Sequence, residues 1–368
     1  MSVLGGLYRR SLGVLKPSSL ALTGDVIPLL PQSLMPPAEE DGDILIGFDE
    51  FGREVYVDFS KLPNAHAVVT GTTGSGKSTL ARSLSLSLLE RDINVVFIDP
   101  HGEHAQFIEN LGGVVVSVDD SPPNVLDPAG FSPQDWGEML SALLTEVTGI
   151  GGLLGSLLRP AMRRAVEKGD LRIALRSLSS TPEVLESVRP VLEPLVRPRL
   201  CIERMLEAGV PLCLVLREKK RLAIEQRAKF LSCVLLAQVQ SIMSSRGVRH
   251  RPELIVIIDE AHRLLSLTTN PILRAYQETR KFGFGFWSLT QLPSLIPLEI
   301  YQLVGFSVFL GGSKEYVEEL SALAFLTDTD REWLLYGVKG YAVVVRQGDP
   351  RPRRVKLAIR REALSLTG

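Results

Sequence analysis

The chain has 368 residues, of which 45% are hydrophobic and 23% are charged, and its formal net charge is −1. This composition is typical of a folded protein with one large domain or two domains. The near-neutral charge excludes a global basic field, so any surface for nucleic acid must be local or created by assembly.

The cysteines and the N-terminal region bear on the cellular compartment. Cys201, Cys213 and Cys233 have no metal-like spacing, and we expect core or near-core thiols in a reducing compartment. Arg9 and Arg10 are not followed by an uninterrupted apolar segment, and no run approaches the roughly 18 apolar residues of a membrane helix. The sequence predicts neither a signal peptide nor a transmembrane helix. We therefore expect a cytoplasmic protein, and peripheral recruitment to a membrane stays open.

The first segment of the chain is rich in proline, which breaks long helices. We expect residues 1–43 to form an N-terminal arm. Residues 44–59 have the pattern of a β-hairpin, because apolar runs flank the turn-like segment 49–52.

A glycine-rich loop gives the clearest functional signal. Residues 71–79 read Gly-Thr-Thr-Gly-Ser-Gly-Lys-Ser-Thr and match the phosphate-loop pattern G-x-x-x-x-G-K-[ST]. An apolar run at 67–69 precedes the loop and a helix-like run at 80–86 follows it, as the pattern requires. Glycines let the backbone wrap phosphates, and successive N–H groups at a helix start hold the anion. We predict that ATP binds to Gly71, Thr72, Thr73, Gly74, Ser75, Gly76, Lys77, Ser78 and Thr79.

Two side chains of this loop have distinct expected roles. We expect Lys77 to reach the β- and γ-phosphates and Ser78 to supply a hydroxyl to Mg²⁺. The alternative is a glycine-rich turn before a helix. It is disfavoured because the lysine, the serine and both flanking elements fit the phosphate loop.

Strand-like and helix-like segments alternate along the rest of the chain. The expected helices are 77–90 and 223–244, together with a mostly helical stretch at 131–208. Buried strands that alternate with helices predict a parallel sheet covered on both faces. The expected strands are 66–70, 94–99, 113–118, 211–216, 254–259, 285–290, 305–310 and 341–346, and the tail 354–359 is expected to pair with the last of these.

Two acids follow one of these strands directly. We expect Asp259 to hold Mg²⁺ through water and Glu260 to polarise the attacking water, because ligands bind at the carboxyl ends of parallel strands. Gln291 ends the next strand and could orient water against the γ-phosphate. The alternatives, ordinary surface acids and an ordinary polar strand end, stay open at this point. The segment 99–104 carries two acids and two histidines, but its spacing matches no common zinc pattern and we disfavour a metal site there.

Four segments in order resemble the HerA/FtsK superfamily of DNA-pumping ATPases. They are closest to the HerA branch and to the ATPases of type IV secretion and conjugation. The resemblance covers roughly residues 44–346, and the segments are 66–79, Asp-Pro-His-Gly-Glu at 99–103, Ile-Asp-Glu-Ala-His-Arg-Leu at 258–264, and 279–291 with Thr-Arg-Lys-Phe-Gly at its start.

The resemblance implies an α/β fold, namely a RecA-like P-loop NTPase with a mostly parallel sheet, a helical insertion and a short N-terminal β-hairpin. It also implies a ring, usually a homohexamer, around duplex DNA bound independently of sequence. Arg280 matches the family's arginine that contacts the γ-phosphate. An arginine supplied by the neighbouring subunit has no clear match, and Arg53 and Arg331 are candidates. The expected divisions are 1–43, 44–130, 131–210 and 211–368.

Two departures from the family leave the cellular role open. The N-terminal barrel of HerA proteins is at most abbreviated, and the large N-terminal domain of conjugation ATPases is missing from the sequence. DNA transfer or conjugation, with channel or pilus proteins as partners, is the leading interpretation. DNA-end processing with a nuclease partner and viral DNA packaging are alternatives. A nucleotide-dependent switch that moves no DNA is the rival of another class.

Basic clusters are the candidate DNA contacts. Lys219, Lys220 and Arg221 follow a predicted strand and could bind phosphates without reading sequence. Arg159, Arg163 and Arg164 in the helical stretch are a second candidate. In both cases a solvated charge run is the competing interpretation.

Overall fold

The structure is a computed structural model, and it describes residues 42–117, 120–216, 222–265, 267, 276–277, 282–324, 326–337, 339–349 and 351–364. Almost all of the expected N-terminal arm lies outside these residues. So do Arg280 and the basic cluster 219–221.

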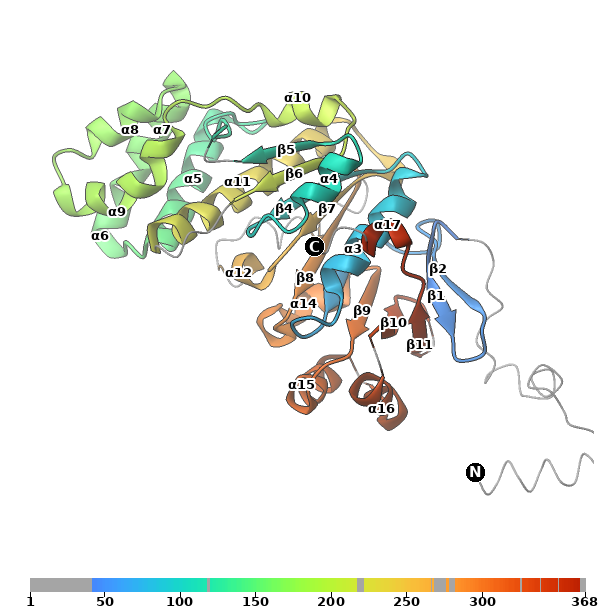
Figure 1. Ribbon diagram of the computed structural model, residues 1–368. Coiled ribbons are helices and arrows are strands. Elements are labelled where there is room, and N and C mark those ends of the chain that lie inside the picture. Colours follow the sequence, from blue (N-terminus) through green and yellow to red (C-terminus); the bar gives the residue numbers. More distant parts are fainter. Residues whose placement is uncertain are drawn as a thin grey trace, which may run out of the picture.

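The described strands form one 11-stranded sheet in the order β2-β1-β11-β10-β9-β3-β8-β7-β4-β6-β5 (Figure 1). The strands are β1 Ile44–Asp49, β2 Glu54–Val57, β3 Ala67–Thr70, β4 Asn94–Asp99, β5 Val114–Ser117, β6 Leu212–Val215, β7 Arg249–Ile258, β8 Phe282–Thr290, β9 Phe306–Leu310, β10 Tyr341–Arg346 and β11 Arg353–Leu357.

Seven neighbouring strands, from β9 to β5 in that order, pair in parallel. Their central members are short apolar runs buried on both faces, which is the pattern of a parallel sheet covered by helices. The expected α/β architecture is therefore confirmed. All the parallel strands end at the same edge of the sheet, and the functional segments lie there.

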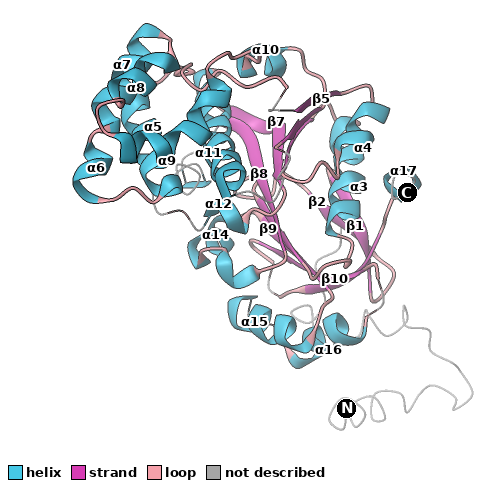
Figure 2. Cartoon of the chain, turned by 60° about the vertical axis from the view of Figure 1, so that its left-hand side comes forward, coloured by secondary structure: helices cyan, strands magenta, loops and turns pink. Residues whose placement is uncertain are grey.

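The helices cover both faces of this sheet (Figure 2). On one face α3 and α4 pack with the apolar cluster that contains Val69, and on the other face α11 and the helical insertion pack with the cluster that contains Val68. Adjacent residues of β3 thus serve opposite faces, as strand geometry requires. The helices are α3 Lys77–Leu89, α4 Ala105–Asn110, α5 Pro133–Thr148, α6 Gly152–Ser156, α7 Leu158–Lys168, α8 Leu171–Ser177, α9 Pro182–Leu192, α10 Ile202–Glu207, α11 Leu222–Ser245, α12 His262–Leu265, α14 Leu298–Leu303, α15 Lys314–Ala324, α16 Asp328–Tyr336 and α17 Arg361–Leu364, with single 3₁₀ turns η3 at Glu193–Leu195 and η5 at Pro293–Leu295.

The helical insertion, α5 to α10, confirms the expected mostly helical stretch and projects from one end of the sheet (Figure 1). Its first helix begins where Ser132 accepts a hydrogen bond from the amide of Asp135, and it ends at Gly149 in the left-handed conformation. Trp136 is fully buried and donates its indole N–H to the carbonyl of Val125 at 2.9 Å. This bond ties the insertion to the chain leaving β5. The domain boundaries themselves stay a prediction.

The expected pairing of the tail is also confirmed. β11 pairs antiparallel with β10, where Tyr341 lies opposite Lys356, and with β1, where Gly47 lies opposite Leu357. β11, the last described strand, therefore joins the N-terminal hairpin β1–β2 to β10 and through it to the parallel strands.

Two strands begin earlier than the sequence indicated. β7 starts at Arg249 rather than 254, and β8 starts at Phe282 rather than 285. The pairing of these strands is irregular between Arg249 and Leu254, where Pro252 removes a backbone donor. Near the start of β8, Gly283 has a φ of +69°, a left-handed conformation outside the usual range of a β-strand. The apolar pattern of the sequence gives no sign that the strand includes such a residue. The expected starts were therefore wrong by a few residues.

Two expectations about composition can be compared with the structure. Cys213 and Cys233 are buried and Cys201 is half-buried, so the prediction of core or near-core thiols is confirmed. Burial raises the pKa of the Cys233 thiol to about 12. Within the described part of the chain, no helix combines the length and the apolar character needed to cross a membrane.

His66, just before β3, is a buried histidine that helps to hold the central strands together. Its Nδ1 accepts a hydrogen bond from the amide of Phe286 at 2.9 Å, and its ring stacks on the ring of Phe286 with centroids 5.7 Å apart. Tyr276 packs against the same imidazole. Burial lowers the pKa of His66 from 6.5 to about 3, because the charged form would lose its hydration.

This shift predicts a pH-dependent stability. The unfolded chain takes up a proton as the pH falls below 6.5, whereas the folded chain does so only near pH 3. The contribution of His66 is therefore complete above pH 6.5 and is lost towards pH 3, at up to about 1.4 kcal/mol per pH unit. His66→Gln, which keeps an acceptor, should flatten this part of the profile in urea unfolding between pH 7.5 and 4.5. His250→Gln, at an exposed histidine, is the control, and equal slopes for all three proteins would contradict the expectation.

Candidate active site

The phosphate-loop segment connects β3 to α3 in a conformation that depends on glycine. Gly74 and Gly76 have φ angles of +76° and +105°, which residues with a Cβ rarely adopt. A Cβ on Gly71 would lie 2.4 Å from Ser75 Oγ and 2.8 Å from the Cβ of Leu310. Since Gly76 precedes the helix without a capping side chain, the first amides of α3 are available to an anion.

Lys77 lies folded back onto this loop. Its ammonium donates to the carbonyls of Gly71 at 2.7 Å and Thr72 at 3.1 Å. Burial lowers the pKa of Lys77, and the nearby carboxylates of Asp259, Glu260 and Glu103 oppose that shift. In the described structure two neutral carbonyl oxygens accept hydrogen bonds from this buried ammonium. An anion such as a phosphate would bind the ammonium more strongly and would replace these two hydrogen bonds.

A cavity of about 610 Å³ opens at the loop. One wall is the loop itself with Arg82 and Glu103, and the other comes from the end of the chain. The second wall was not expected from the sequence, because it comes from the turn before β10 and from β11, α17 and the segment between them, more than 200 positions further along the chain. It consists of Lys339, Gly340, Leu357, Ile359 and Leu364.

The two acids that follow β7 lie at the same edge of the sheet. Asp259 is buried, its Oδ1 accepts the amide of Glu260 at 2.9 Å, and its Oδ2 lies 3.7 Å from Nε2 of His104. Burial alone would raise the pKa of Asp259. His104, the Glu260 amide and Lys77 outweigh burial and hold that pKa below its usual value, so the carboxylate is ionised at neutral pH.

Glu260 has a strained backbone and several partners. Its φ is +52°, and the next amide, that of Ala261, donates to the carbonyl of Leu289 in β8. Its Oε2 lies 3.6 Å from His262 Nε2 and 3.8 Å from Arg263 Nε. The chain thus turns sharply after the strand and holds the carboxylate over the sheet edge.

Gln291 connects the loop to this carboxylate. Its amide Nε2 donates to Glu260 Oε1 at 2.8 Å, and its Oε1 accepts the hydroxyl of Thr73. The parallel pairing of β3 with β8, in which Thr70 lies opposite Thr290, sets this proximity. The structure therefore brings Lys77, Ser78, Asp259, Glu260 and Gln291 together, as the sequence suggested, while their roles stay predictions.

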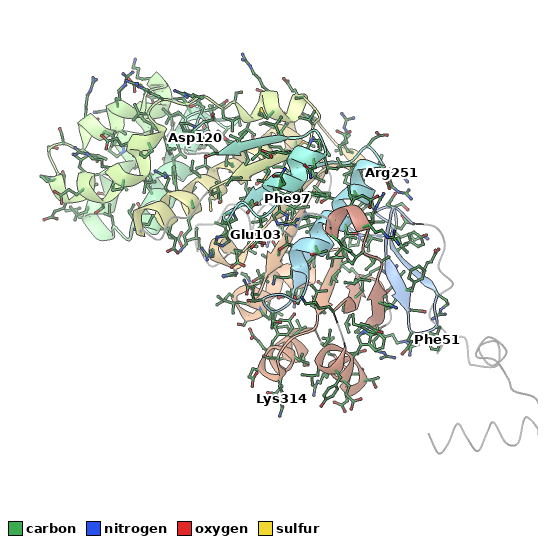
Figure 3. The ribbon with its side chains drawn as sticks, in the orientation of Figure 1. Phe51, Phe97, Glu103, Asp120, Arg251 and Lys314 are labelled. Carbon is green, nitrogen blue, oxygen red and sulfur yellow. The ribbon has the colours of Figure 1, made fainter. Side chains whose placement is uncertain are left out.

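The segment after β4 contributes a carboxylate to which the sequence analysis assigned no role. Asp99 is fully buried, and its oxygens accept the amides of His101, Gly102 and His104. The resulting turn places Glu103 beside α3 (Figure 3), where its Oε2 accepts the hydroxyl of Ser78 at 3.1 Å. The sequence does contain a sign of this role, because the acids Asp99 and Glu103 stand at and just after the end of the strand that follows the loop helix. The described residues contain no group of three or more His, Cys, Asp or Glu side chains gathered as a metal site of their own.

The donor set at the loop nevertheless fits Mg²⁺. A hydroxyl from Ser78 and a carboxylate from Asp259 are hard oxygen donors, which suit a hard cation that retains several waters and binds nucleotide phosphates. Glu103 accepts a hydrogen bond from the Ser78 hydroxyl behind this donor set.

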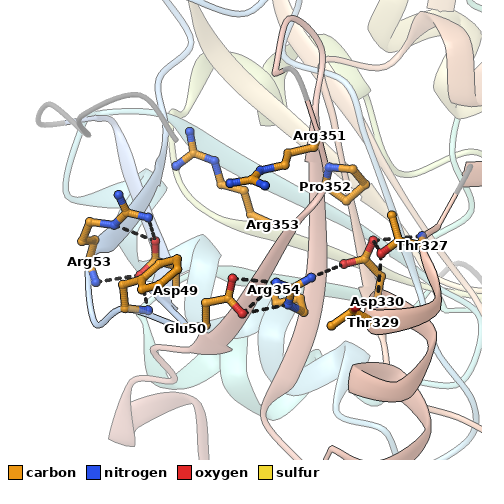
Figure 4. A pocket seen from close by; sticks show the side chains of 11 residues that line it. Asp49, Glu50, Arg53, Thr327, Thr329, Asp330, Arg351, Pro352, Arg353 and Arg354 are labelled. Atoms are coloured by element: carbon orange, nitrogen blue, oxygen red, sulfur yellow. Dashed lines mark hydrogen bonds and ion pairs between the residues drawn. The ribbon is translucent and has the colours of Figure 1, made fainter. Parts of the chain in front are cut away.

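The candidate arginines lie elsewhere or outside the described chain. Arg53 is held by Asp49 at 2.6 Å and lines a separate cavity of about 300 Å³ between the β1–β2 turn and the start of α16 (Figure 4). In that cavity Arg354 bridges Glu50 and Asp330. Arg331 on α16 pairs with Asp328 at 3.4 Å. Neither arginine touches its own phosphate loop, and Arg280 is not among the described residues.

Of the candidate DNA contacts, only the second lies within the described chain. Arg159 and Arg164 are exposed on α7 of the insertion, and Arg163 is half-buried. The backbone of Arg163 packs closely against Gly137 in α5.

Parts of the chain are similar to one protein-family model and to several known proteins. The family model described as "Helicase HerA, central domain" matches residues 45–199, somewhat less than half of the chain. DNA translocase FtsK of Leptospira interrogans is 31% identical over 134 residues, which are 34% of this chain and 14% of that protein. A probable DNA double-strand break repair helicase HerA of Methanocaldococcus jannaschii is 29% identical over 87 residues, which are 23% of this chain and 16% of that protein. The chain thus matches a small part of these relatives.

Solved structures support the fold over nearly the whole chain. VirB4 of Thermoanaerobacter pseudethanolicus superposes with a TM-score of 0.72 at 17% identity, covering 89% of this chain and 99% of that one. The plasmid coupling protein TrwB, in complex with an ATP analogue, gives a TM-score of 0.61 at 17% identity, covering 93% of each chain. The fold is that of a RecA-like P-loop ATPase. The resemblance to the HerA/FtsK superfamily is confirmed by the family model and the relatives together.

Proposed function

We propose that the chain is a ring-forming ATPase that couples ATP hydrolysis to the movement of DNA in DNA transfer or conjugation. The observation that carries the proposal is one edge of the sheet where the phosphate loop, two consecutive acids and a glutamine meet. The hydrogen bonds from Thr73 to Gln291 and from Gln291 to Glu260 join these parts directly.

The proposed roles follow from chemistry and position. Lys77 leaves the loop carbonyls to bind the β- and γ-phosphates, and the amides at the start of α3 bind the remaining oxygens. Ser78 and Asp259 hold Mg²⁺, which supplies charge neutralisation when it is bound. Glu260 takes the proton of the attacking water, and Gln291 orients both water and carboxylate.

The ring is part of the proposal because the resemblance to the HerA/FtsK superfamily implies an arginine that a neighbouring subunit contributes to each site. We infer that Arg280 acts within its own subunit and that a neighbouring subunit supplies a second arginine. Arg53 and Arg331 both lie away from their own loop, as an arginine given to a neighbour would. Guanidinium groups suit the task because they remain charged and bind phosphate in two-point contacts.

Similar proteins support the part of the proposal that concerns movement of DNA in transfer or conjugation. The curated matches include proteins named DNA translocase FtsK, and TrwB is described as a bacterial conjugative coupling protein. TrwB structures contain an ATP analogue, or ADP with Mg²⁺, on the fold that this chain shares. Duplex DNA, channel or pilus proteins, and recruitment to a membrane are the partners and location that this function implies.

A HerA-like motor in DNA-end processing is the second candidate. The match of residues 45–199 to the HerA central domain favours it, as does the relative named a double-strand break repair helicase. This function would require a nuclease partner instead of a channel.

Paired substitutions test the chemistry. Lys77→Ala should abolish hydrolysis and weaken ATP binding, because it removes the charge that meets the phosphates. Glu260→Gln should keep ATP binding and lower turnover by about 10²- to 10⁴-fold, because only proton transfer from water is lost. ATP affinity by calorimetry and steady-state turnover measure both effects. Glu299→Gln, at an exposed acid of α14, is the control. Near-normal turnover of Glu260→Gln would remove Glu260 from the role of base.

DNA stimulation tests the motor. Duplex DNA should accelerate ATP hydrolysis independently of sequence, and log affinity should fall linearly with log salt, with a slope of about −0.9 per phosphate contact. Neutralising Lys219, Lys220 and Arg221 should lower both the affinity and the slope while basal ATP binding stays unchanged. Arg159→Gln with Arg164→Gln tests the second cluster in the same assay.

Arg172→Gln with Arg176→Gln, on the exposed side of α8, removes equal charge from the insertion and is the matched control for that second cluster. If no form of DNA stimulates the assembled protein at low salt, the motor proposal fails, and a nucleotide-dependent switch replaces it.

A further inference from the structure

The hydroxyl of Ser78 has a specific acceptor. It donates to Oε2 of Glu103 at 3.1 Å. Asp259, the carboxylate proposed to hold Mg²⁺, is engaged differently: its Oδ1 accepts the Glu260 amide, and its Oδ2 faces His104 at 3.7 Å. The proton of Ser78 therefore points to the segment after β4 and not to the strand that ends in the acidic pair.

The turn that presents Glu103 is built by a buried carboxylate. Asp99 is fully buried and accepts three backbone amides, from His101 at 3.1 Å, Gly102 at 2.7 Å and His104 at 2.7 Å. Gly102 has a φ of +79°, so the turn needs glycine at that position. The Cys213 thiol of β6 also donates to Oδ2 of Asp99 at 3.7 Å. Three of the four bonds to Asp99 therefore come from its own loop, and they hold the turn that presents Glu103.

Arg82 fixes the same turn from the side of α3. It lies one helical turn after Ser78, is only 4% exposed, and donates Nη2 to the carbonyl of Glu103 at 2.5 Å. Its charge faces Glu103, Asp99 and Asp259. A buried arginine bonded to the main chain and a buried aspartate under the turn fix the backbone from which the exposed Glu103 side chain reaches Ser78.

We propose that Glu103 is a positioning residue for the metal: it accepts the proton of the Ser78 hydroxyl and so turns an oxygen lone pair of Ser78 toward Mg²⁺. The inference rests on the proposed function, because it assumes that the loop binds a nucleotide with Mg²⁺. A hydroxyl can serve as a metal ligand and a hydrogen-bond donor at once, and an acceptor beyond the ligand raises its basicity and fixes its orientation.

The test measures metal-dependent nucleotide binding rather than turnover. ADP affinity of the full chain is determined by calorimetry in EDTA and across a range of Mg²⁺ concentrations. Glu103→Ala should raise the half-saturating Mg²⁺ concentration by about tenfold, as is typical for loss of a partner behind a ligand, and the affinity of each variant in EDTA is the reference for its own Mg²⁺ dependence. Glu103→Gln, which keeps an acceptor oxygen, should stay within about threefold of the unsubstituted protein. Because Glu103 is exposed, these variants are expected to fold. Glu109→Ala, an exposed acid of α4, controls for the lost charge.

A double-mutant cycle with Ser78→Ala isolates the pair. Once the hydroxyl is gone, Glu103→Ala should change the Mg²⁺ dependence no further, because the two residues act through one hydrogen bond. A full additional effect in that background would overturn the proposal. A glutamine variant as impaired as the alanine variant would do so as well, since it would show that the negative charge, and not an acceptor, is required.

The outcomes separate this inference from the function beneath it. If the unsubstituted protein binds ADP more tightly with Mg²⁺ and Glu103→Ala behaves identically, the positioning role is wrong and the nucleotide site stands. If the unsubstituted protein binds no ADP in either condition, the nucleotide site and the positioning role fail together.

Discussion

Parallel hydrogen bonding of β3, β8, β7 and β4 is the constraint on which the rest of this structure depends. Thr70 lies opposite Thr290, Ile258 opposite Ser288, and Ile98 beside Ile258. With that register, four chain segments far apart in sequence leave the sheet at one edge. The loop, the turn carrying Glu103, the acidic pair and the glutamine meet because their strands end together.

This edge of the sheet brings basic and acidic side chains close together, so that charges of opposite sign offset one another. Lys77 and Arg82 lie among Asp99, Glu103, Asp259 and Glu260, and burial lowers the pKa of both cations. Buried charges are tolerated only when partners surround them, and here every acid already has one. The nucleotide and its metal would add phosphate charge and a cation to a site that is already organised, so little rearrangement would be required beyond the swing of Lys77.

Features that depend on short contiguous stretches of sequence could be predicted, whereas features that depend on contacts between distant segments could not. The phosphate loop, the acids at 259–260 and the pairing of the tail with β10 come from contiguous patterns, and the structure has them where expected. The bond of Glu103 to Ser78 depends on Asp99 folding its own loop, which no spacing rule indicates. The wall formed by Leu357 and Ile359 depends on β11 crossing to β1, a long-range pairing. Arg280 stays a prediction of the resemblance.

Hydrogen exchange measured with and without a non-hydrolysable ATP analogue and Mg²⁺ tests the central claim most directly. The account predicts slower amide exchange in three separate segments, residues 72–79, 100–104 and 259–262, because the nucleotide and metal would close over the edge where they meet. Exchange in the helical insertion, 133–207, should be unchanged in the unassembled protein. Protection confined to the loop, or found mainly in the insertion, would contradict the claim that one sheet edge forms the active site.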